Sequence, residues 1–376
     1  MKTLFRLLAA ALTALFLSAT PALAQSQWDG VSRIVAIGDL EGDYDKFTDM
    51  LRTSGLINAQ NNWSGGTAHL VQLGDIPDRG PNTRMVMDLL MRLEPQARRA
   101  GGHVHALIGN HEAMNIEGDL RYTDAREFAS FATRNSTRVR NQYYQRTIRA
   151  MRRNPPASGL PTFDAAYRAQ WDQEHPLGWV EHRQAWAPSG RYGRWIATHD
   201  AVIRINDTLF LHAGLGAVYA AAPRQGMNDA VRAALRGRPS QVYPEILESA
   251  GPLWYRGLSQ NAEAAETANL ENVLRAQGVA RVVVGHTKVT STVLPRFNGR
   301  VLIADIAHTP SDPHAFLIME NGVWTTIHRG QRVPITASTP QATCAYLRQI
   351  VALDNGVGPV AELERTQCAV TAAAAN

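Results

Sequence analysis

The chain has 376 residues, 45% of them hydrophobic and 19% charged, and its formal net charge at pH 7 is +5. The length allows one large globular domain or two smaller ones. This net charge is too small to indicate a polyanionic partner by itself. Only local clusters of basic residues could indicate one.

Residues 1–24 have the pattern of a secretory signal peptide. Lys2 and Arg6 precede an apolar stretch over 7–17, and the small-residue sequence Ala22-Leu23-Ala24 comes just before Gln25. This pattern predicts cleavage after Ala24 and an exported protein, periplasmic or secreted. A membrane anchor is the alternative, but the apolar stretch is short for a span. No later apolar segment approaches that length, so we expect no membrane span in the mature chain.

Apolar strands alternate with helical spacing over residues 32–112. Buried strands are predicted over 33–38, 69–73 and 103–108, and helical spacing occupies 44–53 and the stretch after Pro81. This alternation is typical of a parallel sheet. Ligands bind at the carboxyl ends of the strands in open α/β sheets. We therefore expect the loops that follow these strands to meet at one crevice, and we expect His69, His103 and His105 to be packed residues of the strands.

The loops after these strands are rich in candidate metal ligands. They read Gly38-Asp39-Leu40-Glu41-Gly42-Asp43, Gly74-Asp75-Ile76-Pro77-Asp78-Arg79-Gly80 and Gly109-Asn110-His111-Glu112. Carboxylate, amide and imidazole groups suit a pair of divalent ions about 3.5 to 4 Å apart, which hold both oxygens of a phosphoryl transfer. We predict that Asp75 bridges the ions, because it follows the middle strand, and that Asp39 completes one site.

An arginine-rich segment, 119–194, follows the third of these loops. Prolines interrupt it, and we expect a mostly helical insertion that is either a cap beside the crevice or a solvated surface decoration. Clustered arginines can also bind nucleic acid. The segment contains no nucleic-acid module that we recognise, and we expect no such partner.

The second half of the chain supplies further strands and two histidines at strand ends. Strands are predicted over 201–205, 208–212, 281–284, 301–305, 315–320 and 323–327. His212 and His286 each follow such a strand and, with Asn110, would complete the second metal. We predict one domain over 25–330, which contains the insertion, and a tail over 331–376.

The remaining polar residues of the crevice suit phosphate chemistry. A metal-bound hydroxide would attack phosphorus in line. Arg79, and Arg256 from the aromatic loop over 251–257, are candidates to bind the phosphoryl oxygens. His111 is the candidate general acid, with Asp78 fixing its tautomer and raising its pKa.

The ordered motifs Gly-Asp-x-x-Gly, Gly-Asp-x-x-Asp-Arg-Gly, Gly-Asn-His-Glu, His-Ala-Gly and Gly-His-Thr resemble the calcineurin-like metallophosphoesterases. Asp-Arg-Gly and Gly-Asn-His-Glu point to the branch related to the phosphoprotein phosphatases, and Pro252-Leu253-Trp254-Tyr255-Arg256 is most similar to Shewanella-like phosphatases. The resemblance implies a four-layer α/β/β/α sandwich with two central sheets. It also implies a dinuclear site of manganese, iron or zinc, and phosphomonoester hydrolysis with a preference for phosphotyrosine.

Glu41 departs from the family pattern, which has a histidine ligand of the first metal at this position. The first site would then consist of Asp39, Glu41 and Asp75, all oxygen donors. Oxygen donors favour manganese or magnesium over iron or zinc, and manganese is the ion we expect. The rival interpretation is a weakened first site, with a mononuclear, sluggish or inactive protein.

The sequence thus predicts an exported metal-dependent phosphatase whose substrate is a phosphorylated small molecule, peptide or protein. A nucleotide or dinucleoside-polyphosphate hydrolase is the alternative within enzymes. A non-catalytic metal- or phosphate-binding protein is the alternative outside them. The cysteines, Cys344 and Cys368, either form one disulfide in an oxidising compartment or remain free thiols.

Overall fold

The computed structural model describes residues 25–306 and 314–373. The predicted signal peptide, 1–24, lies outside the described residues. Within 25–306 and 314–373, no helix is both long enough and apolar enough to cross a membrane.

One of two six-stranded sheets contains the predicted parallel strands. Its order is β12-β11-β10-β2-β3-β4, and β2, β3 and β4 are parallel neighbours. The strands span Arg33–Ile37 (β2), His69–Gln72 (β3), His103–Ala106 (β4), Phe316–Glu320 (β10), Val323–His328 (β11) and Gln331–Pro334 (β12). The parallel arrangement predicted for the first half of the chain is therefore confirmed, and antiparallel strands from the C-terminal part extend it.

The other sheet has the order β1-β5-β6-β7-β9-β8. Its strands span Gln27–Trp28 (β1), Val202–Ile205 (β5), Thr208–Leu211 (β6), Arg281–Val284 (β7), Leu294–Arg296 (β8) and Val301–Ile303 (β9). The predicted hairpin joins β5 to β6, and β6, β7 and β9 are parallel. Strands β1, β8 and β12 were not predicted, because they lie at sheet edges and lack the continuous apolar run of a strand that is buried between two neighbours.

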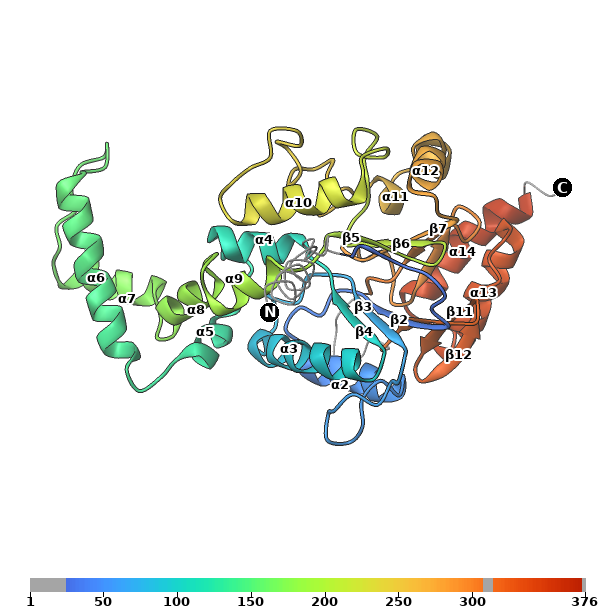
Figure 1. Cartoon of the computed structure of the whole chain (residues 1–376), viewed down its shortest axis with the longest axis horizontal. Helices are drawn as coiled ribbons and strands as arrows, with labels where there is room; N and C mark the ends of the chain where they lie inside the picture. Colours follow the sequence, from blue (N-terminus) through green and yellow to red (C-terminus); the bar gives the residue numbers. More distant parts are fainter. Residues whose placement is uncertain (1–24, 307–313, 374–376) are drawn as a thin grey trace, which may run out of the picture.

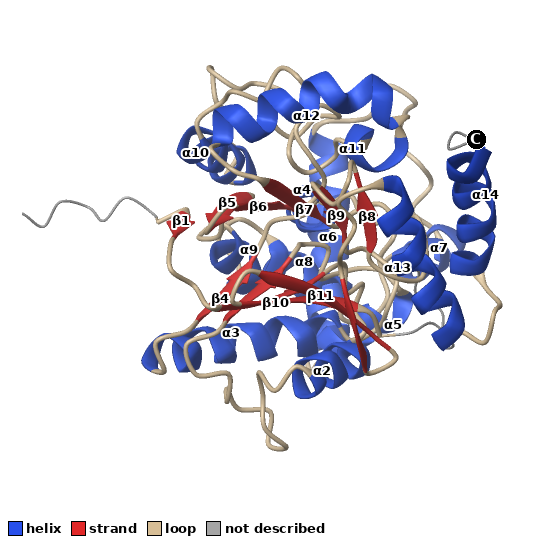
Figure 2. Ribbon diagram, turned by 90° about the vertical axis from the view of Figure 1, so that its right-hand side faces the viewer, coloured by secondary structure: helices blue, strands red, loops and turns tan. Residues whose placement is uncertain are grey.

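The two sheets stack with helices on both outer faces (Figure 2). Each sheet is apolar on both faces, as the alternating side chains of β2 illustrate. Ile34 and Ala36 face the apolar layer between the sheets, and Val35 and Ile37 belong to the layer under the helices. The covering helices are α2 (Tyr44–Thr53) and α3 (Thr83–Arg99) on one side, and α10 (Arg224–Leu235), α11 (Gly257–Gln260) and α12 (Glu263–Gln277) on the other. The predicted four-layer α/β/β/α sandwich is confirmed.

The arginine-rich segment forms a series of helices that extends away from the sheets, with α6 at the left end of Figure 1. The helices are α5 (Ala125–Phe131), α6 (Ser136–Arg153), α7 (Ala165–Glu174), α8 (Trp179–Trp186) and α9 (Arg191–Ile196). They attach to α4 (Asn110–Glu117), where Arg183 of α8 donates to the carbonyl groups of Asn115 and Ile116. Whether the insertion is a cap of the crevice or a solvated decoration stays at the two predicted alternatives.

The C-terminal tail packs as two helices, α13 (Pro340–Leu353) and α14 (Pro359–Ala373). A disulfide joins Cys344 of α13 to Cys368 of α14, which confirms the paired alternative. Helix α13 begins at Pro340, because the Thr339 hydroxyl caps it by accepting from the Ala342 amide.

Candidate metal and phosphate site

The polar loops meet at one edge because their backbones are bonded to one another. The amides of Leu40 and Glu41 both donate to the carbonyl of Asp75, each over 3.0 Å. The buried carboxylate of Glu112 accepts from the amides of Asp75, Ile76 and Gly109, which ties the second loop to the third. Several loop residues, including Glu41, Asp75 and His286, have positive φ. A positive φ is a strained backbone conformation for these residue types, and such strain is common where the fold fixes side chains at a functional site.

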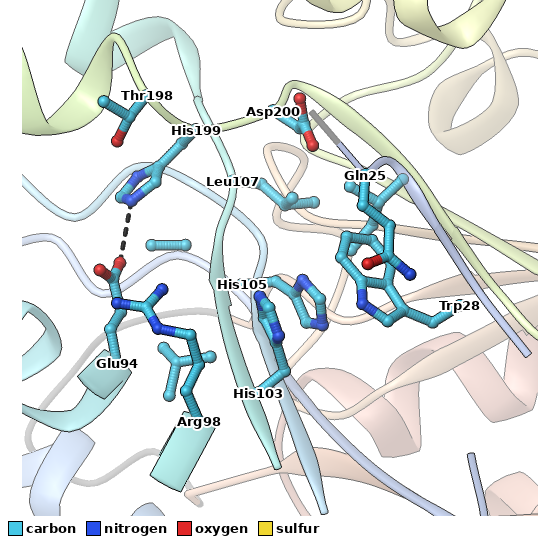
Figure 3. Close-up of a pocket in the computed structure, with 13 residues that line it drawn as sticks. Gln25, Trp28, Glu94, Arg98, His103, His105, Leu107, Thr198, His199 and Asp200 are labelled. Carbon is cyan, nitrogen blue, oxygen red and sulfur yellow. Dashed lines mark ion pairs between the residues drawn. The ribbon is translucent and has the colours of Figure 1, made fainter. Parts of the chain in front are cut away.

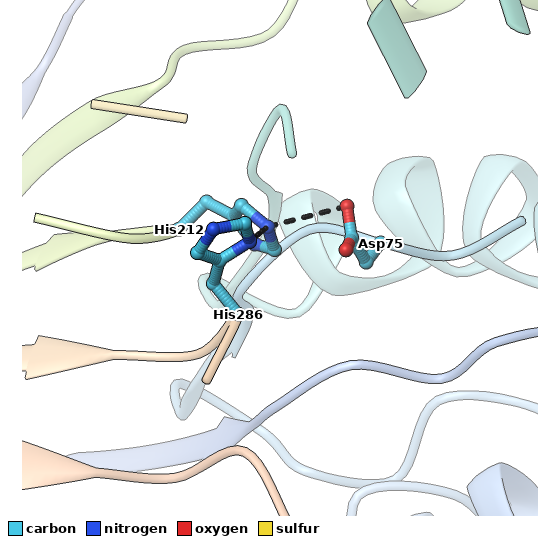
Figure 4. A group of neighbouring side chains, drawn as sticks. All are labelled: Asp75, His212 and His286. Carbon is cyan, nitrogen blue, oxygen red and sulfur yellow. Dashed lines mark hydrogen bonds and ion pairs between the residues drawn. The ribbon is translucent and has the colours of Figure 1, made fainter. Parts of the chain in front are cut away.

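Asp75, Asn110, His212 and His286 converge in the interior (Figure 4 shows the carboxylate and both imidazoles). Nδ1 of His212 donates to the carbonyl of Leu73 over 2.7 Å, so Nε2 faces the group and offers it a lone pair when the ring is neutral. That Nε2 lies 3.2 Å from Oδ1 of Asp75, 2.9 Å from Oδ1 of Asn110 and 3.0 Å from Nδ1 of His286.

This group fits a divalent cation. Buried lone pairs that face one another need a positive charge between them. Burial lowers the pKa of His212, but the charge of Asp75 outweighs it and raises this pKa to about 9, so the group strongly attracts a cation. Imidazole, carboxylate and amide together suit manganese, iron or zinc. Nε2 of His286 is also buried, with no hydrogen-bond partner among the described residues.

Asp39 lies at the end of β2 beside this group. Its Oδ1 accepts from the backbone amide of His286 over 2.9 Å and lies 4.0 Å from Nδ1 of His212. Burial and the charge of Asp75 raise the pKa of Asp39 to about 6. Two nearby buried carboxylates therefore repel each other, which a metal ion between them would relieve.

Glu41 pairs with two cations. Arg79 pairs with its Oε1, and Nζ of Lys288 lies 2.6 Å from its Oε2. The carboxylate is buried, with 5% of its side chain exposed, whereas Arg79 and Lys288 are partly exposed. That Glu41 is a metal ligand stays a prediction. The motifs did not single out Lys288, and its position two residues after His286 was the available signal.

His111 and Asp78 form a buried pair. Nδ1 of His111 lies 2.6 Å from Oδ2 of Asp78, and its Nε2 lies 3.7 Å from Oδ2 of Asp75. Burial lowers the pKa of His111, but the charges of Asp75 and Asp78 and the Asp78 hydrogen bond raise it above the ordinary value. Thr123 donates to the other Asp78 oxygen over 2.8 Å and holds it in place.

The phosphate candidates lie on different loops. Arg79 is partly exposed, and its guanidinium carbon lies 5.4 Å from the ring centroid of Tyr122. Arg256 donates to the carbonyl of His286 over 2.9 Å and to the Thr287 hydroxyl over 3.1 Å, which attaches it to the metal-ligand loop. Tyr122 was not predicted as a site residue. It also lies beside His111, with ring centroids 5.1 Å apart.

A separate cavity of about 320 Å³ lies at the side of the two sheets (Figure 3). It is lined by Trp28, His103, His105 and His199, among others. Burial lowers the pKa of His105 and of His103, and the rings of these two residues stack with centroids 4.3 Å apart. Among the described residues, the acid and histidine group with ligand atoms close enough for a metal is the one at Asp75. The expectation that the strand histidines are packed residues fits this arrangement.

Comparison with known proteins places these features in a family. Residues 32–289 match the family model described as calcineurin-like phosphoesterase. Shewanella-like protein phosphatase 2 of Arabidopsis thaliana is 30% identical over 275 residues, which cover 70% of this chain and 68% of that protein. The crystal structure of the cold-active protein-tyrosine phosphatase of a psychrophilic Shewanella species superposes with a TM-score of 0.63 and 26% identity, covering 84% of each chain.

Proposed function

We propose that this chain, which belongs to the calcineurin-like phosphoesterase family and is a phosphatase, is an exported enzyme that hydrolyses phosphomonoesters and prefers phosphotyrosine in peptides or proteins. The observation that carries the proposal is the convergence of Asp75, Asn110, His212 and His286 beside the His111–Asp78 pair. A cation site and a proton donor at one edge are the two requirements of metal-assisted phosphoester hydrolysis.

The side chains have distinct roles in this proposal. Divalent ions held by the metal-ligand residues would supply Lewis acidity to the phosphoryl group and the attacking water. Arg79 and Arg256 bind the phosphoryl oxygens and orient the phosphorus, since guanidinium matches phosphate in geometry and charge. Because Nδ1 of His111 is committed to Asp78, the proton on its Nε2 is the one that passes to the leaving oxygen.

We propose two divalent ions, with manganese as the first choice. Asp75, Asn110, His212 and His286 would hold one ion, and Asp39 and Asp75 would contribute to the other. The oxygen-rich surroundings of Asp39 support a hard ion.

An aromatic ring at the crevice supports the preference for phosphotyrosine. Tyr122 has 43% of its surface exposed and contacts both Arg79 and His111. A substrate ring whose phosphate reaches Arg79 would stack on it, and such contacts contribute roughly 0.5–1.5 kcal/mol. The protein-tyrosine phosphatase among the structural relatives supports the same class of substrate.

The disulfide supports export. A bond between Cys344 and Cys368 forms and persists in an oxidising compartment such as the periplasm, and not in a reducing cytosol.

Phosphate release from a substrate panel tests the proposal. Phosphotyrosine peptides, phosphoserine peptides, nucleotides and a dinucleoside polyphosphate are each assayed with manganese, magnesium, zinc or iron. We expect the highest kcat/KM for phosphotyrosine with manganese. A preference for nucleotides would replace the proposed substrate class, and metal binding without phosphate release from any substrate would indicate a binding protein.

A further inference from the structure

Asp305 is a buried acid whose role the family resemblance does not assign. It follows β9, and only 1% of its surface is exposed. Neither of its carboxylate oxygens has a hydrogen-bond partner within 25–306 and 314–373. Leaving a buried carboxylate without a hydrogen-bond donor is unfavourable, because the charge has lost its water and gained no hydrogen bond in return. A bound cation at this carboxylate would remove that cost.

The position of Asp305 places it at the first-metal side of the centre. Gly38, which precedes Asp39, packs so closely on Ala304 and Asp305 that a Cβ at position 38 would overlap the Ala304 carbonyl. The charges that act on the Asp305 carboxylate are those of Asp39, Lys288 and Asp75. The Asp39 carboxylate lies within hydrogen-bonding reach of it, but it offers no donor while both groups are ionised. Asp305 thus lies on the Asp39 side of the metal-ligand group.

Glu41, by contrast, already has its charge balanced. Arg79 contacts one of its oxygens, and Lys288 lies 2.6 Å from the other. A carboxylate that is paired with two cations is a weak donor to a third. An unpaired buried carboxylate is a strong one, because coordination supplies the missing positive charge.

We propose that Asp305 is a ligand of the first metal ion together with Asp39 and Asp75, and that Glu41 is a counter-ion of Arg79 and Lys288 instead of a ligand. Asp305 then supplies the donor that the family takes from the histidine at position 41. The resulting site consists of carboxylates, which favours manganese or magnesium. Glu41 then holds Arg79 at the crevice, where it meets phosphate. The inference rests on the proposed function for the existence of a dinuclear centre.

Metal content tests the inference without an activity assay. Wild type, Asp305→Asn and Glu41→Gln are stripped with chelator, loaded with manganese, desalted and measured for manganese per chain. Asp354→Asn is the matched control, because Asp354 is also a buried acid but pairs with His328 and Arg329. We expect two ions in wild type, Glu41→Gln and Asp354→Asn, and one ion in Asp305→Asn. The electron spin resonance signal of coupled manganese should disappear only in Asp305→Asn.

Several outcomes overturn the inference. Two ions in Asp305→Asn show that Asp305 is not needed as a ligand, and one ion in Glu41→Gln with two in Asp305→Asn makes Glu41 the ligand. One ion in wild type and two in Lys288→Met show that the Lys288 ammonium occupies the first position. If Asp305→Asn does not fold, Asp305→Glu replaces it: it keeps the carboxylate, and a tenfold or larger loss of affinity for the first ion alone is expected. Normal metal content without phosphatase activity would overturn the proposed function and leave this inference intact.

Discussion

Nδ1 of His111 lies 2.6 Å from Oδ2 of Asp78 in a buried pair at the edge of the metal-ligand group. This contact orients the imidazole so that Nε2 faces the centre. It also keeps the ring protonated to a higher pH than an isolated histidine, since the charges of Asp75 and Asp78 outweigh burial in setting the His111 pKa.

The pH dependence of turnover should report this pair. A general acid works when protonated, so kcat falls as pH rises through the pKa of His111. Asp78→Asn removes the charge and lowers that pKa, so the falling limb of the pH profile of kcat should move to lower pH. An unchanged limb would show that His111 is not the acid.

His111→Asn should lower kcat roughly 100-fold or more, with a smaller loss for an aryl phosphate whose leaving group is a weak base.

Arg79 should be needed for phosphate affinity. Arg79→Ala removes a charged hydrogen-bond donor, worth about 1.5–3 kcal/mol, so the inhibition constant of inorganic phosphate should rise roughly tenfold or more. Arg84→Ala is the control, because Arg84 contacts the Ser130 carbonyl and the Phe131 ring. Equal effects of the two variants would mean that Arg79 acts only through the net charge.

Tyr122 should determine the preference for aryl substrates. Tyr122→Leu removes the exposed ring beside Arg79 and His111 and should lower kcat/KM for a phosphotyrosine peptide about tenfold, with less change for phosphoserine. Tyr122→Phe keeps the ring and should retain most of the preference. A parallel loss on both peptides would assign Tyr122 to the positioning of Arg79 or His111 instead.

Metal removal should destabilise the protein. A ligand that binds the folded state stabilises it by about 2.7 kcal/mol at 100 times its dissociation constant. We therefore expect chelation to lower Tm and manganese to restore it. His212→Asn should reduce this shift, because it removes the nitrogen that faces Asp75, Asn110 and His286. A Tm that does not respond to chelator in wild type would argue against a metal in this group.

Loss of the disulfide should weaken the C-terminal helices. The bond closes a loop with a sequence separation of 24 between Cys344 and Cys368. Loop-closure entropy for that length predicts a loss of about 3.5 kcal/mol in the free energy of unfolding. Urea unfolding of Cys344→Ser/Cys368→Ser, compared with wild type under oxidising conditions, measures it. An unchanged midpoint would mean that α13 and α14 are held by packing alone.

Local patterns in the sequence were sufficient for the core of the fold. Buried parallel strands produce continuous apolar runs, and β2, β3 and β4 follow them closely. Because parallel strands end at the same edge, the order of the motifs is enough to place Asp39, Asp75 and Asn110 together. The strands β1 and β8 were missed, since pairing with a neighbour and not their own composition makes them strands.

The partners of the acids were decided by tertiary structure alone. Glu41 and Lys288 are 247 residues apart, and no local pattern relates them. Asp305 was visible in the sequence only as the last residue of a strand, and neither its lack of a hydrogen-bond partner among the described residues nor the close approach of the two sheets at Gly38 could be read from a local pattern. Residue type and spacing therefore determined which elements carry the chemistry. Charge balance among buried side chains depends on distances across the sandwich, and only the folded chain sets them.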